Sequence, residues 1–139
     1  MQKNYMILNG TNVGISNIEL KKSELIIVDK SKKYQFVVTI FYNWQNINKI
    51  KIGDNEEIKF NEYILSENNE AALIWPTISS VKKIDENKIV FYFEFKDLKN
   101  ICFMNKREKF DISIESLSIK VYINYKDVKN KIIKYIFDS

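Results

Sequence analysis

Residues 78–97 read ISSVKKIDENKIVFYFEFKD, and this stretch decides the fold class. Its second half alternates an apolar set, which is Ile89, Phe91, Phe93 and Phe95, with a mixed set, which is Val90, Tyr92, Glu94 and Lys96. Successive residues of a β-strand point to opposite faces, so this alternation predicts a strand with one fully apolar face. The polar run at residues 85–88 separates it from a second strand pattern at residues 78–84. We predict a β-hairpin whose phenylalanine face belongs to the core.

The same two-residue rhythm recurs along the rest of the chain. It predicts strands at residues 5–8, 15–20, 24–29, 34–43, 50–52, 57–65 and 71–75, with a single helical turn as the alternative for the last of these. Many short strands separated by polar clusters are typical of all-β folds. We predict an antiparallel β-sandwich of about 8–10 strands, with a barrel-like arrangement as the alternative. A chain of 139 residues suits one hydrophobic core, so residues 1–139 are expected to form a single domain.

Two hairpins and one irregularity are expected within this pattern. Residues 24–29 should pair with residues 34–43, and residues 50–52 with residues 57–65 around a turn that begins at Gly53. Further on, the apolar side chains change from even positions (110, 112 and 114) to odd positions (117 to 125). A slip of one residue reverses the faces of a strand. We therefore predict a bulge or sharp bend near residues 115–116, or a strand that passes from one sheet to the other.

The last residues of the chain leave the two-residue rhythm. Val128, Ile132, Tyr135 and Ile136 follow helical spacing, and Asp127 is a favourable residue for a helix N-cap. We predict a short amphipathic C-terminal helix over residues 127–137. Such a helix would cover an edge of a sheet, where unpaired backbone groups invite association.

The composition excludes several kinds of chemistry. The chain has no histidine, which excludes Ser-His-Asp and Cys-His catalysis and zinc sites that use histidine ligands. Its single cysteine, Cys102, lies in the apolar run ICFM and is expected to be an unreactive buried thiol. Three scattered glycines make no phosphate-binding loop. We expect neither an enzyme nor a bound cofactor.

Charge and hydropathy point to a small cytoplasmic protein. The formal net charge is +4, but the lysines are spread along the chain rather than gathered into one basic stripe, and Arg107 is the single arginine. No apolar run approaches the length that a membrane-spanning helix requires, and the first residues do not resemble a signal peptide. The abundance of Lys, Asn and Ile is what an AT-rich bacterial or phage genome produces through its codons.

Acidic clusters at residues 54–57, 67–70 and 85–87 raise the question of a metal or hydrolase site. None has the spacing of a calcium-binding EF-hand loop, and Asx-rich turns explain all three clusters. A pair of carboxylates for glycoside hydrolysis needs a cleft, for which such short loops leave little room. We therefore expect no bound metal and no hydrolase site.

The two tryptophans mark the candidate interaction residues, because each follows the end of a strand pattern. We expect Trp75 to be a lid on the core, whereas Trp44 is either such a lid or an exposed anchor for a partner. The candidate partner-binding residues are Tyr42, Trp44, Asn46, Lys106 and Arg107.

By elimination, the leading hypothesis is a non-catalytic protein-binding module. An immunity or inhibitor protein that occludes a toxin or enzyme is one form, and the lysine surplus favours an acidic patch on the partner. The first alternative is single-stranded nucleic-acid or polyanion binding, because aromatic residues are interleaved with lysines. The second is a structural protein of a phage or cell. A homodimer formed by edge strands is compatible with each of these hypotheses.

Overall fold

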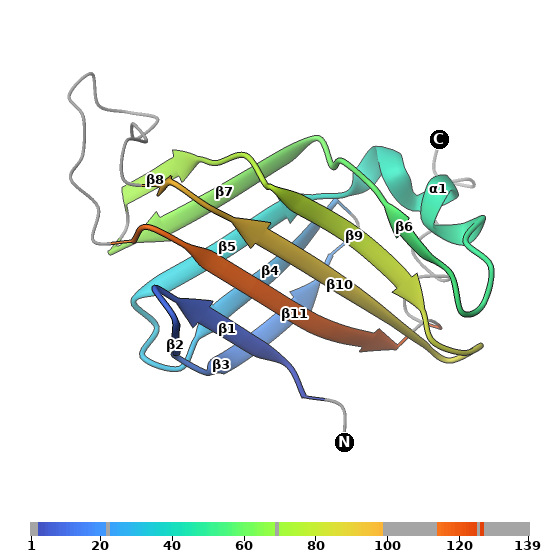
Figure 1. Cartoon of the computed structure of the whole chain (residues 1–139), viewed down its shortest axis with the longest axis horizontal. Helices are drawn as coiled ribbons and strands as arrows, with labels where there is room; N and C mark the ends of the chain where they lie inside the picture. The colour runs from blue at the N-terminus through green and yellow to red at the C-terminus, as the bar shows by residue number, and fades with distance from the viewer. Residues whose placement is uncertain (1–2, 22, 69, 99–113, 125, 127–139) are drawn as a thin grey trace.

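The structure, a computed structural model, describes residues 3–21, 23–68, 70–98, 114–124 and 126. Within these residues eleven strands form two separate antiparallel sheets that pack face to face (Figure 1). The prediction of an all-β sandwich is therefore confirmed, with the described strands slightly more numerous than expected. The predicted C-terminal helix at residues 127–137 lies outside the described residues, as does Cys102.

The strands are divided between a six-stranded and a five-stranded sheet. The six-stranded sheet has the order β2 (Thr11–Asn12), β1 (Tyr5–Leu8), β11 (Leu117–Asn124), β10 (Lys88–Phe95), β9 (Ile78–Lys83) and β6 (Asn55–Glu57). The five-stranded sheet has the order β3 (Ile15–Leu20), β4 (Glu24–Asp29), β5 (Tyr34–Thr39), β7 (Glu62–Glu67) and β8 (Glu70–Leu73). A short 3-10 helix, η1 (Phe41–Asn43), continues into α1 (Trp44–Asn48) at one end of the sandwich.

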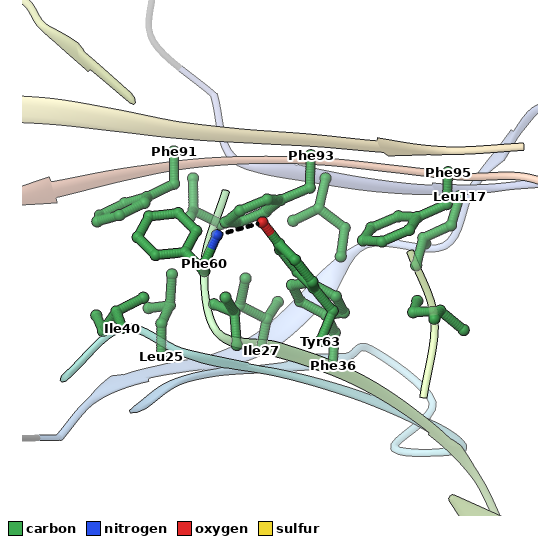
Figure 2. Close-up of a cluster of buried hydrophobic side chains, with 14 of the residues drawn as sticks. Leu25, Ile27, Phe36, Ile40, Phe60, Tyr63, Phe91, Phe93, Phe95 and Leu117 are labelled. Atoms are coloured by element: carbon green, nitrogen blue, oxygen red, sulfur yellow. Dashed lines mark hydrogen bonds between the residues drawn. The ribbon is translucent and has the colours of Figure 1, made fainter. Parts of the chain in front are cut away.

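Aromatic rings from both sheets fill the space between them. The apolar set of β10, which is Ile89, Phe91, Phe93 and Phe95, is fully buried, as the alternation predicts. Figure 2 shows these rings pointing from β10 toward Phe36 of β5 and Tyr63 of β7. The ring centroid of Phe36 lies 5.3 Å from that of Phe93 and 5.5 Å from that of Phe95. Tilted contacts at such distances add to the stabilisation that burial provides.

One chain of hydrogen bonds crosses this apolar interior. The hydroxyl of Tyr63 donates to Ser79 Oγ of the opposite sheet at 2.7 Å, and the Ser79 hydroxyl donates to the carbonyl of Ile58 at 2.6 Å. The backbone N–H of Phe60 donates to the Tyr63 hydroxyl at 2.8 Å (Figure 2). Ser79 and Tyr63 are almost completely buried, so each of these polar groups is paired where water cannot reach it.

The predicted strand at residues 34–43 is too long. β5 ends at Thr39, and the chain turns into η1 and α1. Ile40, Trp44 and Ile47, all fully buried, follow the i, i+4, i+7 spacing of a helix, which closes one end of the core. Lys83, itself only 6% exposed, donates from Nζ to the carbonyl of Asn48 at the end of α1, at 2.9 Å.

The predicted hairpin between residues 50–52 and 57–65 is wrong. Residues 50–52 are not a strand, and the rest of this region is divided between β6 and β7, which belong to different sheets. The backbone N–H of Gly53 donates to the Lys83 carbonyl, which places β6 beside β9. Ile58 and Phe60 are then buried in the crossover, and the buried positions change to Tyr63 and Leu65 in β7. That change of phase marks the passage from one sheet to the other.

The sharp bend near residues 115–116 is confirmed. The chain bends at Glu115, and both Ile114 and Leu117 are buried, which accommodates the change of phase. Asn9 holds the bend, because its side-chain oxygen accepts the backbone N–H groups of Glu115 at 2.7 Å and Ser116 at 3.1 Å. Residues 110–113 lie outside the described residues, so the earlier part of this pattern stays a prediction.

Replacing Tyr63 with Phe tests the hydrogen bonds inside the core. The variant keeps the ring but leaves the Phe60 N–H without its acceptor and removes the donor to Ser79. We expect the free energy of unfolding to fall by about 1–3 kcal/mol, measured by chemical denaturation. Tyr122→Phe removes the same hydroxyl from a partly exposed site and should change it by less than about 0.5 kcal/mol. Equal effects of the two substitutions would contradict a role for the buried hydrogen bonds.

Candidate protein-interaction faces

The outer face of the six-stranded sheet carries three tyrosines and two lysines. Alternation turns the core residues of β1, β10 and β11 inward, so Tyr5, Tyr92 and Tyr122 point outward. Together with Lys82 and Lys120 they line a hollow of about 460 Å³, and we refer to these five residues as the tyrosine face. In Figure 1 this sheet is seen from its outer side, and no described helix or strand lies in front of it.

The register of the strands brings these side chains together from distant parts of the sequence. Lys120 on β11 is paired with Tyr5 on one side and with Tyr92 on the other. In the neighbouring row Val90 is paired with Tyr122 and Lys82. Val90 is only 5% exposed but is not part of the core cluster, which identifies it as the floor of the hollow on the outer side. Lys120 Nζ also lies 5.9 Å from the centre of the Tyr122 ring, a cation–π distance.

Glu94 lies beside the tyrosines and raises the pKa of one of them, Tyr92. The Tyr92 hydroxyl donates to Glu94 Oε2 at 3.0 Å, and Glu94 Oε1 is 3.4 Å from Lys96 Nζ. Burial raises the pKa of the Tyr92 phenol above its ordinary value, and the hydrogen bond to Glu94 and its negative charge raise that pKa further. The raised pKa thus favours the protonated phenol, which donates the hydrogen bond to Glu94.

Substitution of Glu94 by Gln should lower the pKa of Tyr92. The shape is kept but the charge is removed, so the pKa should fall part of the way toward the ordinary value of 10.0, while burial still keeps it raised. Because the pKa of Tyr92 is higher in the folded than in the unfolded protein, its protonated phenol adds to the free energy of unfolding, and this contribution is complete below the unfolded pKa. The contribution is lost as the pH rises through the folded pKa of Tyr92. Titration of isotope-labelled tyrosines by NMR measures the shift, with Tyr122 as the internal control. An unchanged Tyr92 pKa would show that Glu94 does not act on it.

The outer face of the five-stranded sheet is chemically different, because an apolar row crosses it. Ile26, Val37, Ile64 and Leu73 are paired in register across β4, β5, β7 and β8. Val37 is 8% exposed yet lies outside the core cluster, which places it on the outer side. Beyond β8 the buried Ile74 continues the alternation, so Trp75 points outward and is 71% exposed. We refer to Ile26, Val37, Ile64, Leu73 and Trp75 as the tryptophan face.

Carboxylates border the tryptophan face. In the row next to the apolar one, Thr39 is paired with both Glu24 and Glu62. The backbone N–H of Ile74 donates to the carbonyl of Tyr63, so the chain still runs beside β7 as it reaches Trp75, level with Glu62. The charged residues that line the hollow of the tyrosine face are thus lysines, with Glu94 beside them, whereas those next to the apolar row of the tryptophan face are glutamates.

The residues predicted as a partner site are not brought together on either face. Tyr42 is 70% exposed in η1, and Asn46 is exposed on α1, where it lines a separate hollow of about 370 Å³ that also includes Asn43. Trp44 is fully buried, so the interpretation of this residue as an exposed anchor is wrong and the alternative of a core lid is confirmed. Lys106 and Arg107 lie outside the described residues, and their role stays a prediction.

The prediction that Trp75 is a lid on the core is also wrong, because its side chain is exposed. The sequence pattern contained the reason. Ala72 and Ile74 are the buried residues of an alternation that continues past β8, which leaves Trp75 on the solvent side.

The tyrosine face was only partly visible in the sequence, where Tyr92 lies on the mixed side of its strand. The sequence contained no signal for the pairing of Tyr5 with Lys120.

Comparison with known proteins finds no protein family, no curated protein and no solved structure that matches this chain. Among the described residues, no three side chains of the kinds that ligate metals gather at one place. None of the helices in the described part of the chain combines the length and the apolar character needed to span a membrane.

Intrinsic fluorescence can distinguish the two tryptophans. Replacing the exposed Trp75 with Phe leaves the buried Trp44 as the sole tryptophan, so emission under selective excitation of tryptophan reports on Trp44. We expect the emission maximum to move to shorter wavelength and quenching by iodide to fall sharply, with the free energy of unfolding changed by less than about 0.5 kcal/mol. Emission that stays accessible to iodide in this variant would contradict the burial of Trp44.

Proposed function

We propose that this chain is a non-catalytic protein-binding module and that its tyrosine face binds an acidic surface of a partner protein. The observation that carries the proposal is the convergence of three tyrosines and two lysines on a single hollow of about 460 Å³. Residues from four strands build this surface, so its shape is set by the rigid sheet rather than by a loop.

The chemistry of the face suits recognition of a protein. Tyrosine is enriched in interface hot spots, since it supplies a large contact area and a hydroxyl at small cost in conformational entropy. Burial of Val90 and Ser80 beneath the tyrosines gives the surface a closed floor. The lysines would steer an acidic partner toward the face. An immunity or inhibitor protein would use such a face to occlude the acidic surface of a toxin or enzyme.

Binding of a single-stranded nucleic acid is the second candidate, because aromatic rings beside lysines can stack bases and neutralise phosphates. The carboxylate of Glu94, next to Tyr92, would repel a phosphate backbone and an acidic protein surface alike, so it does not separate the two candidates. The nuclease treatment in the test below separates them.

A charge-reversal pull-down tests the proposal. The wild-type chain and the double variant Lys82→Glu/Lys120→Glu serve as baits in native lysate at low and moderate salt, with and without nuclease. We expect the wild type to retain a discrete protein after nuclease treatment, and the variant to lose at least tenfold in recovery. Loss of two charge-assisted contacts of about 1 kcal/mol each accounts for such a change.

The matched control is Lys32→Glu/Lys51→Glu, which makes the same change in net charge at two exposed lysines outside the tyrosine face. This control should retain the partner. The proposal is wrong if the face variant and the control retain the same protein equally. It is also wrong if the material bound by the wild type is nucleic acid that nuclease removes.

A further inference from the structure

The two outer faces of this sandwich are complementary to each other, and we infer that the tyrosine face of one copy binds the tryptophan face of a second copy. The inference deepens the proposed function, on which it rests, by identifying the acidic partner surface as one that the chain itself carries. The resulting contact is head-to-tail, because the two surfaces belong to different sheets.

Shape complementarity is the first argument. Trp75 is a large apolar side chain that is 71% exposed, and exposed tryptophans are enriched at interface hot spots. The tyrosine face offers a hollow of about 460 Å³ with aromatic walls and Val90 in its floor. An indole that enters this hollow would meet tyrosine rings at the edge or face and a lysine ammonium within cation–π reach.

Charge complementarity is the second argument. Glu24 and Glu62 lie in one row beside the apolar row of the tryptophan face, with Glu62 level with Trp75. Lys82 and Lys120 border the hollow on the tyrosine face. With Trp75 in the hollow, Glu62 of one copy would face the lysines of the other, while Glu94 on the tyrosine face is paired with Lys96 of its own chain. Opposite charges at the rim of an apolar contact set its orientation and raise the rate of encounter.

The position of the two faces determines the kind of assembly. They are the outer surfaces of two sheets packed face to face, so they point in opposite directions. A copy that is bound through one face still presents the other face to solvent. Such an interface adds further copies until the rotation closes a ring, or grows into an open filament when it does not.

The test uses purified full-length protein and sedimentation velocity over a range of concentration and salt. Wild type should show a weight-average mass that rises with concentration at low salt and falls as salt is added. Trp75→Ser, which lacks the indole, and Lys82→Glu/Lys120→Glu, which lacks the positive charges, should each remain monomeric under the same conditions.

Mixing these two variants is the decisive step. Trp75→Ser keeps an intact tyrosine face, and the lysine variant keeps an intact tryptophan face, so the equimolar mixture should form a dimer that cannot grow. The control Lys32→Glu/Lys51→Glu should assemble as the wild type does.

A wild type that stays monomeric at every concentration and salt would overturn the inference, as would a dimer that persists unchanged in each variant alone. A monomeric wild type whose capture of a foreign acidic protein is lost with Lys82→Glu/Lys120→Glu would overturn self-assembly but support the proposed function. Loss of neither capture nor assembly in the lysine variant would overturn both.

Discussion

The hydrogen bond between Tyr63 and Ser79 joins the two sheets across the core and lies at the place where the chain passes between them. The chain leaves the six-stranded sheet after β6, passes through β7 and β8, and returns at β9. The first of these crossings is tied to this bond, since Ser79 also donates to the carbonyl of Ile58 and the Tyr63 hydroxyl accepts the N–H of Phe60. The second crossing leads into β9, whose second residue is Ser79. Trp75 lies on the segment that connects β8 to β9, and Lys82 lies on β9. Ser79 is thus close in sequence both to Trp75 of the tryptophan face and to Lys82 of the tyrosine face.

The sequence predicts strands well where one face is apolar throughout. In β10 the phenylalanines identify both the strand and its buried side, and the ends of β1, β3 and β4 also agree with the predicted ranges. It fails where the chain changes sheet, because a crossover such as Ile58 to Phe60 keeps the two-residue rhythm while its surroundings change. It also fails at α1, where the burial of Trp44 depends on helical spacing that only three residues express. The tyrosine face depends on strand order, and no local pattern specifies that Tyr5 lies beside Lys120.

The two outer faces show how one sheet architecture can support different surfaces. On the six-stranded sheet the outward positions carry phenols and ammonium groups above a small apolar floor. On the five-stranded sheet the outward positions carry an apolar row with carboxylates at its side. The inward positions of both sheets are mostly apolar, with Asp29, Ser79 and Lys83 as buried polar exceptions. On these outer faces Val37, Ser80 and Val90 are themselves buried, so substitutions there are expected to affect stability as well as the surface.

The place of β11 within its sheet has a consequence for folding. β11 lies between β1 and β10, so Tyr5 finds its partner Lys120 only after more than a hundred intervening residues have been synthesised. Until β11 is in place, β1 can pair only with the two-residue strand β2, and β10 has an unpaired edge. Contacts so distant in sequence slow folding, because loop-closure entropy is lost before the contacts can compensate for it. The five-stranded sheet has all its strands within residues 15–73 and can form first, as a platform on which the other sheet is completed.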